Sequence, residues 1–543
     1  MRRRIRATVT AGALLASLVG VPVPALAESA RPETRVDRTG LDWGPCKDLE
    51  PRGDEVLECA TLTVPLVRTA GGDRVPGADE TVELALSRVR ATGTTRHTLI
   101  VNPGGPGSGA RRWASMTHGR MPEELREVYD VVAFDPRGVG ASTPAITCDP
   151  DYFSPVRPDT VPADGAEEAA LRADAQAYAR ACAENTGRLL SHTRTEDTAH
   201  DMDAVRRALG EDRIDYLGYS YGSYLGTVYS SLYPNRVRSL VLDSVVDPDN
   251  PWYESNHVQS RALQRAAQHF FDWAARHHAT YRLGRTGDEV AEAYYRLRSE
   301  LRADPIEATV GPTELETAAL VVAYADSTWP GVARALSARI NEGDSTGLLT
   351  LHRTYGDHAD NDRSYGGYLA VQCTDAHWPT DWSAWRTDAR LAHEEAPFVG
   401  WHNAWYNAPC LDWDADSGDW FQVGDAPHEH RAFDGPALIV HASGDGATPV
   451  EGAHALRDRL PGSVLVMEEG GHTHGVAFTG NLCVDELVAA YLLRGTLPAR
   501  RPSGPDVACE RRPEPRPSSR REDLRAAAEG VAAVIADLPG DPG

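Results

Sequence analysis

Short apolar segments alternate with segments of helical periodicity along most of the chain, and this alternation limits the possible folds more than any other feature. The runs "HTLIVN", "YDVVAF", "IDYLGY", "VRSLVLD", "ALIVHA" and "SVLVMEE" have the length and composition of strands. Between them, "EDTAHDMDAVRRALG" carries Met202, Val205 and Leu209 at helical spacing and ends at a glycine. Strands that alternate with helices predict an α/β protein with a mostly parallel sheet.

The alternation stops between residues 251 and 430, where segments of helical periodicity rich in tryptophan and tyrosine replace the strand-like runs. The strand pattern then resumes at "GPALIVHASGD". We therefore expect one α/β domain, formed by residues 28–250 and 431–509, with a mainly helical cap at 251–430. A separate domain on linkers is the alternative, but no stretch rich in proline and serine flanks the insertion. The polar, proline-rich tail at 510–543 is expected to be partly disordered.

The N-terminus has the pattern of an export signal. "MRRRIR" is a basic segment, an apolar stretch with small residues follows, and Ala25–Ala27 fits a signal-peptidase site. We predict a signal peptide over residues 1–27, cleavage after Ala27, and a secreted protein; the Sec and twin-arginine routes both stay open. A membrane anchor is the alternative, but Pro22 and Pro24 favour cleavage. No later stretch is long and apolar enough to predict a stable membrane association.

Cysteine use and charge narrow the chemistry further. An even number of cysteines in an exported chain favours disulfides over buried free thiols. Sequential pairing is the simplest arrangement, and it gives Cys46–Cys59, Cys148–Cys182, Cys373–Cys410 and Cys483–Cys509. Because none of these forms a C-x-x-C pair, no metal site is expected, and nothing predicts an organic cofactor. The net charge of −24 disfavours a nucleic-acid partner, since phosphates would be repelled.

A G-x-S-x-G pattern at Gly218, Ser220 and Gly222 follows a predicted strand and precedes a predicted helix. A tight strand-to-helix turn of this kind exposes the serine hydroxyl above a parallel sheet, and flanking glycines avoid steric clashes there. The alternative is an ordinary serine in a glycine-rich loop. The strand before the pattern and the helix after it favour Ser220 as a nucleophile.

A serine hydroxyl needs a base, and the base needs a carboxylate that orients it. In this fold the acid and the histidine follow the serine in that order, on loops after later strands. The strand "ALIVHAS" ends in "GDGATP", which offers Asp445, and "VLVMEE" ends in "GGHTHG", which offers His472 and His474. His472 is the preferred base because it lies nearest the strand end, and His474 is the alternative.

The glycine loop "NPGGPGSG" at Asn102–Gly109 is expected to complete the site. An oxyanion needs backbone N–H donors, one from Tyr221 after the nucleophile and one from this loop, where glycines allow close approach. Phosphate binding is the alternative for a glycine loop. However, the loop lacks both the Gly-Lys-Ser/Thr ending of a P-loop and the spacing of a dinucleotide-binding motif.

Together, "PGGPG", "DPRGVGAS", "GYSYGSYLG", "GDGATP", "GGH" and "NLCVDELVAAYLLRGTLP" resemble the secreted actinobacterial tripeptidyl aminopeptidases, in the proline-iminopeptidase branch of the serine α/β-hydrolases. The resemblance covers about residues 41–509. It implies an α/β-hydrolase fold with Ser220 as nucleophile, Asp445 as acid and His472 as base. It also implies Gly105 and Tyr221 as the oxyanion donors. Proline iminopeptidases usually have histidine where this chain has Pro103, which weakens an assignment to proline specificity.

The resemblance also implies carboxylates that bind the free α-ammonium of the substrate, because a desolvated cation requires a paired anion. Asp243 and Asp247 lie where the cap begins, and Asp375 and Asp412 lie inside it. Asp243, Asp247 and Asp375 are the preferred candidates.

These features predict a secreted, monomeric serine exopeptidase that releases short peptides, expected to be tripeptides, from substrates with free N-termini. A carboxylester hydrolase could use the same triad with a different cap, and it is the principal alternative. A non-enzymatic binding protein on a hydrolase scaffold is a further alternative, disfavoured because all members of the triad are present.

Overall fold

The structure is a computed structural model that describes residues 40–51, 53, 55–423, 433 and 435–517. The predicted signal peptide and most of the predicted tail lie outside the described residues. At the centre is a 10-stranded sheet with the order β1-β2-β3-β5-β4-β6-β7-β8-β9-β10. The strands are β1 (Gly44–Pro45), β2 (Leu57–Pro65), β3 (Thr81–Val89), β4 (His97–Asn102), β5 (Tyr129–Phe134), β6 (Ile214–Tyr219), β7 (Val237–Asp243), β8 (Ala437–Ala442), β9 (Ser463–Glu469) and β10 (Val507–Glu510).

The sheet is antiparallel at one edge and parallel elsewhere. Strands β1, β2, β3 and β5 pair antiparallel, whereas every pair from β5 through β4, β6, β7, β8 and β9 to β10 is parallel. The predicted α/β class with a mostly parallel sheet is therefore confirmed. In such a sheet the carboxyl ends of neighbouring strands meet at one edge, so the loops after β4, β6, β8 and β9 come together.

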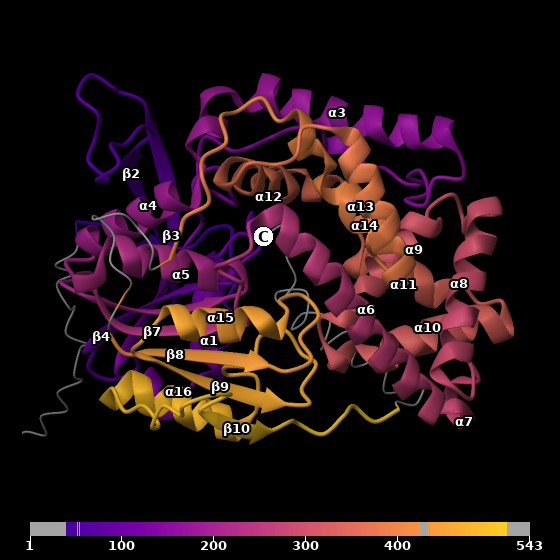
Figure 1. Cartoon of the computed structure of the whole chain (residues 1–543). Helices are drawn as coiled ribbons and strands as arrows, with labels where there is room; N and C mark the ends of the chain where they lie inside the picture. The colour runs from indigo at the N-terminus through magenta and orange to yellow at the C-terminus, as the bar shows by residue number, and fades with distance from the viewer. Residues whose placement is uncertain (1–39, 52, 54, 424–432, 434, 518–543) are drawn as a thin grey trace, which may run out of the picture. The chain divides into compact units, whose positions relative to one another are not determined.

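Successive side chains of each central strand point to opposite faces of the sheet, and both faces are buried. Leu99 and Val101 on β4 pack in one apolar cluster with α1 and α16, whereas Ile100 packs in the other with α4, α5 and α15. Figure 1 shows these two layers of helices around the strands. The helices are α1 (Arg111–Arg120), α2 (Glu123–Arg126), α4 (Thr195–Ala208), α5 (Tyr221–Leu232), α15 (Val450–Arg459) and α16 (Leu482–Arg494).

A mainly helical region lies between β7 and β8, as the fold prediction required. It contains α6 (Trp252–Arg276), α7 (His278–Tyr281), α8 (Gly287–Ala303), α9 (Pro312–Ala319), α10 (Trp329–Glu342), α11 (Thr346–Tyr355), α12 (Asp362–Asp375), α13 (Trp382–Glu395) and α14 (Gly400–Asn407). Short 3-10 turns at Leu320–Ala323, Asp326–Thr328 and Ala408–Asp412 join some of these helices. We call this region, residues 252–412, the helical layer.

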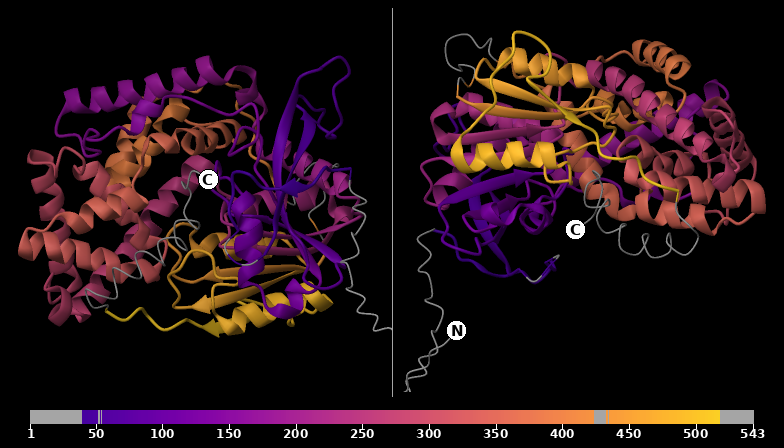
Figure 2. Two further views of the ribbon diagram at one scale, coloured as in Figure 1. Left: turned by 180° about the vertical axis from the view of Figure 1, so that it is seen from behind. Right: turned by 90° about the horizontal axis from the view of Figure 1, so that it is seen from below.

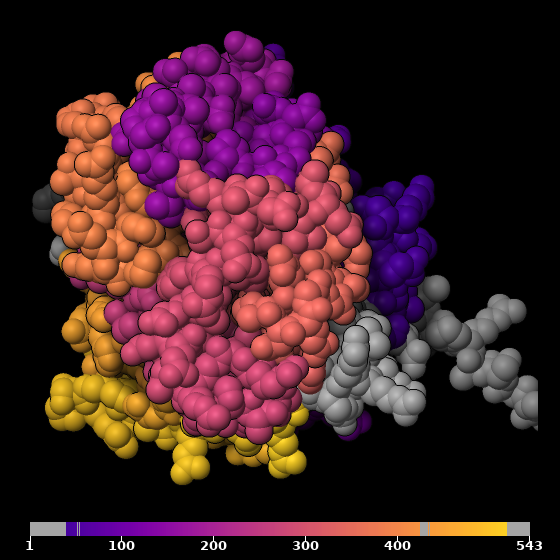
Figure 3. Space-filling view, turned by 90° about the vertical axis from the view of Figure 1, so that its right-hand side faces the viewer, coloured from indigo at the N-terminus to yellow at the C-terminus, as the bar shows by residue number. Residues whose placement is uncertain are grey.

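One helix from outside this region joins it. Helix α3 (Gly165–Thr186) lies between β5 and α4 in the sequence, yet it packs against α14 and the turn that follows α14. Figures 1 and 3 show α3 along the outer edge of the helical layer. The sequence indicated that the helical region begins at residue 251, and this boundary leaves α3 out of it.

All four predicted disulfides are confirmed, and each joins one cysteine to the next cysteine along the chain. One of them, Cys373–Cys410, lies within the helical layer. In the part of the chain that the structure describes, no helix has the length and apolar character needed to cross a membrane.

The described part of the segment that follows β10 packs on the rest of the chain. Figures 1 and 2 show it running from the edge of the sheet to the helical layer. The Arg512 N–H donates to Glu468 on β9 (3.0 Å), and the Trp273 indole on α6 donates to the carbonyl of Pro515 (3.0 Å). Residues 511–517 therefore connect the sheet to α6.

Candidate active site

Ser220 occupies the tight turn between β6 and α5. Its backbone has φ 55° and ψ −127°, a positive φ that is costly for any residue other than glycine. The Ser220 N–H donates to the carbonyl of Asp243 at the end of β7 (3.0 Å), which fixes the turn against the neighbouring strand. This is the strand-to-helix geometry that the G-x-S-x-G pattern predicted.

Two glycines let the loop after β4 approach this turn. A Cβ atom on Gly222 would lie 2.6 Å from the carbonyl oxygen of Asn102. A Cβ atom on Gly104, where φ is +103°, would lie 2.7 Å from the Cβ of Ser220 and 3.0 Å from the Tyr221 nitrogen. The glycine loop and the serine turn are therefore in direct backbone contact, and no larger residue fits at either position.

Asp445 follows β8 and is buried, with its carboxylate held on several sides. Oδ1 accepts from the N–H groups of Ala447 (2.8 Å) and Thr448 (3.0 Å), and Oδ2 accepts from the Thr448 hydroxyl (3.0 Å). His474 Nδ1 lies 2.8 Å from Oδ2 and 3.1 Å from Oδ1. Burial opposes the ionised form, but the charge and hydrogen bond of His474 hold the pKa of Asp445 well below its usual range.

The loop that carries His474 is fixed from two directions. On one side, the His474 N–H donates to the carbonyl of Tyr324 in the helical layer (2.7 Å). On the other, the Gly475 N–H donates to the Ser244 hydroxyl (2.7 Å), at the end of β7. Since an ionised carboxylate only accepts, Nδ1 of His474 is its protonated nitrogen, and Nε2 carries the lone pair that a general base requires.

Of the two candidate histidines, the structure places His474, and not the preferred His472, within hydrogen-bond distance of Asp445. The Nδ1 atom of His472 has no hydrogen-bond partner among the described residues, and its ring lies 4.2 Å from the ring of His269 on α6 and 5.9 Å from that of Trp329 on α10. Burial, then the neighbouring His269, lower the pKa of His472 to about 4. The loop after β9 turns at Gly470, where φ is +72°, and reaches Asp445 only two residues beyond His472.

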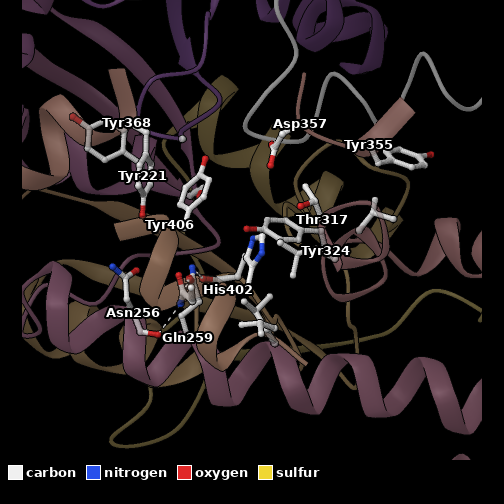
Figure 4. A pocket seen from close by; sticks show the side chains of 18 of the residues that line it. Tyr221, Asn256, Gln259, Thr317, Tyr324, Tyr355, Asp357, Tyr368, His402 and Tyr406 are labelled. Atoms are coloured by element: carbon white, nitrogen blue, oxygen red, sulfur yellow. Dashed lines mark hydrogen bonds between the residues drawn. The ribbon is translucent and has the colours of Figure 1, made fainter. Parts of the chain in front are cut away.

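A pocket of about 420 Å³ opens over Ser220 and is lined by residues of the sheet loops and of the helical layer. Gly105, Ser220 and Tyr221 line it on the sheet side. In the view of Figure 4, Tyr221 and Tyr368 lie on one side, Asp357 and Thr317 on the other, and Tyr406 between them. A volume of this size is typical of pockets for small ligands.

The acids predicted to bind a substrate amine occupy different environments, and two do not reach the pocket. The buried Asp243 carboxylate accepts from the N–H groups of Val476 and Ala477, behind His474, and burial raises its pKa to about 6. The Asp375 carboxylate accepts from the Thr195 N–H (2.7 Å) and hydroxyl (2.6 Å), and burial raises its pKa to about 6. Neither Asp243 nor Asp375 lines the pocket over Ser220.

Of the other two acids, Asp247 lines the pocket, but its carboxylate accepts from Asp249 (2.9 Å) and Asn250 (2.6 Å) in its own loop. Asp412 forms an ion pair with Arg172 on α3, away from the pocket lining.

Sequence reasoning missed several residues that shape the site. Thr448 lies in the "GDGATP" motif and could have been found as a partner of Asp445. Tyr324 and Asp357 had no sequence signal, because they lie in short connections between helices that carry no motif, and only the packing of the layer brings them to the pocket.

The chain is similar to known proteins over most of its length. The family model described as "alpha/beta hydrolase fold" matches residues 97–474. The tripeptidyl aminopeptidase of Streptomyces lividans is 37% identical, over 95% of this chain and 99% of that protein. The serine protease Hip1 of Mycobacterium tuberculosis is 31% identical, over 86% of this chain and 90% of that protein. Carboxylesterase B of the same species is 31% identical, over 84% and 88%.

Proposed function

This chain belongs to the tripeptidyl aminopeptidase family of α/β hydrolases and is a serine exopeptidase, and we propose that Ser220, His474 and Asp445 are its catalytic residues. The observation that carries this proposal is the buried Asp445–His474 hydrogen bond of 2.8 Å, on loops that meet the Ser220 turn. His474 replaces His472 in the assignment because it alone has an acid to orient its ring.

In this proposal His474 Nε2 takes the proton of the Ser220 hydroxyl as its oxygen attacks the scissile carbonyl. The imidazolium that forms is stabilised by Asp445, which stays ionised, and it then gives the proton to the leaving amine. Water, activated by the same imidazole, hydrolyses the acyl-enzyme. The Tyr221 and Gly105 N–H groups are proposed as the oxyanion donors, supported by the contact between their two loops.

We assign the binding of the substrate ammonium to Asp357 instead of the acids chosen from the sequence. Asp357 lines the pocket, and Arg157 donates to its Oδ2 (3.0 Å) and also pairs with Glu314 (3.4 Å). One cation shared by two carboxylates leaves a net charge of −1, which favours an incoming ammonium group. The helical layer, with α3, acts as the cap that holds this acid across the pocket from Ser220.

The test uses purified wild type and Ser220→Ala on peptides with free and N-acetylated termini. We expect Ser220→Ala to lose on the order of 10⁵-fold or more in kcat, and wild type to prefer free N-termini strongly. Mass spectrometry identifies the released products. Equal activity in wild type and Ser220→Ala would contradict the assignment of the nucleophile.

The similarity to a protein named carboxylesterase B keeps ester hydrolysis as the second candidate function. The same triad would serve it, so the distinction rests on the pocket and not on the catalytic residues. Short acyl esters assayed beside the peptides separate the two. Rapid ester turnover without peptide cleavage would favour the esterase.

We also propose that the protein is exported as a monomer after cleavage at Ala27. The four disulfides support an oxidising compartment. N-terminal sequencing and the mass in solution of protein from culture medium test this proposal. A mature chain that retains residues 1–27, or a stable dimer, would contradict it.

A further inference from the structure

A second cavity of about 340 Å³ lies directly behind the pocket over Ser220. Two residues of α14, His402 and Tyr406, line both spaces. The second cavity is lined by further aromatic side chains, including Tyr152 and Tyr365, and by the carboxylates of Asp149, Asp151 and Asp174. The two spaces are therefore separated by a partition that is one side chain thick at His402 and Tyr406.

An ion pair crosses the same partition. Asp357 lines the pocket over Ser220, and its partner Arg157 lines the second cavity. Arg157 is fixed by its N–H, which donates to Glu314 (2.9 Å), and by its guanidinium, which donates to Thr317 (2.8 Å). The buried His402 ring beside it is uncharged at neutral pH, because burial and the neighbouring Arg157 lower its pKa to about 4. At this partition, Arg157 is therefore paired and His402 is uncharged.

A row of tyrosines connects the partition to the oxyanion loop. A Cβ atom on Gly107 of that loop would lie 2.4 Å from the Tyr368 nitrogen, so the loop and α12 are in contact. The ring of Tyr368 lies 5.1 Å from that of Tyr406, which lies 4.6 Å from that of Tyr365 in the second cavity. Figure 4 shows Tyr406 between Tyr221 and Asp357. The partition therefore begins one tyrosine away from the loop that faces the reacting carbonyl.

We propose that Tyr406 and His402, with the Asp357–Arg157 pair, fix the length of the released peptide by closing the pocket at its N-terminal end. This inference rests on the proposed function. An exopeptidase must enclose the short acyl part of its substrate, whereas the long leaving chain points to solvent. The partition ends the enclosed space beside the acid that binds the terminal ammonium. The second cavity is large enough, and acidic enough, to receive further N-terminal residues once the partition is removed.

The experiment compares wild type with Tyr406→Ala and His402→Ala on a peptide series with free N-termini of increasing length, read by mass spectrometry. Tyr406→Phe keeps the ring, and Tyr355→Ala removes a tyrosine that lines the first pocket but not the second cavity. Labelling of Ser220 with a fluorophosphonate identifies the variants that are folded. If only one of the two alanine variants is labelled, that variant is sufficient for the test.

We expect the ratio of longer products to the wild-type product to rise at least tenfold in the alanine variants. Tyr406→Phe and Tyr355→Ala should keep the wild-type length distribution, whatever their effect on rate. Labelled alanine variants that release only the wild-type length would overturn this inference and leave the proposed function intact. A wild type that cleaves no member of the series would overturn the proposed function, and this inference with it.

Discussion

The loop after β9 has two sides in opposite surroundings. The side that faces the sheet is held by hydrogen bonds, through His474 to Asp445 and through Gly475 to Ser244. The side that faces the helical layer carries His472, whose ring contacts those of His269 and Trp329. The two histidines, two residues apart, thus differ in kind: His474 has a carboxylate that orients its ring, and His472 is kept neutral by burial.

In the proposed function, the helical layer therefore has a second role besides enclosing the substrate. The helical layer contacts the loop that carries His474 on the side away from Asp445, where the Thr473 hydroxyl donates to Asp326 (3.0 Å) and the His474 N–H donates to Tyr324 (2.7 Å). Because a displacement of about 1 Å can cost on the order of 10²-fold in rate, these contacts bear on catalysis as well as on specificity.

The largest effect on the sheet side is expected from Asp243→Ala. The Asp243 carboxylate accepts from the backbone N–H groups of Val476 and Ala477, just after His474, so its loss frees the loop while Ser220 and Asp445 remain. We expect kcat to fall by about 10²-fold with a smaller change in KM, measured with one peptide substrate. Asp249→Ala, at an exposed acid after the same strand, is the matched control. Similar losses in both variants would show that Asp243 does not act through the loop.

A smaller effect is expected in the pH dependence of stability. Burial raises the pKa of Asp243 from 3.8 to about 6 in the folded chain, so folding takes up a proton between these values. The contribution of Asp243 to stability is then complete below about pH 4 and is lost as the pH rises through 6. Relative to Asp243→Asn, wild type should lose about 2 kcal/mol of unfolding free energy between pH 4 and 7.

Urea unfolding of the two proteins at each pH measures this difference, in which the contributions of other groups cancel. A difference that is constant with pH would mean that the carboxyl titrates alike in the folded and unfolded chains.

The parts of the fold and of the candidate site also differ in how far the sequence could predict them. The strands, the Ser220 turn and Asp445 were predictable, because a buried parallel strand is a local apolar run and its loop follows directly. The four-residue strand β10 and the contribution of α3 to the helical layer were not, since both depend on packing partners far away in the sequence. The choice between His472 and His474 could not be made from the sequence for the same reason, because it depends on where the loop turns against Tyr324.

The measurement that tests the account most directly is kcat/KM for wild type, His474→Gln and His472→Gln with one peptide that has a free N-terminus. We predict a loss on the order of 10⁴-fold or more for His474→Gln and less than about tenfold for His472→Gln, because only His474 is oriented by Asp445. Thermal unfolding of each variant confirms that it is folded. Near-complete loss in His472→Gln with activity retained in His474→Gln would contradict the account.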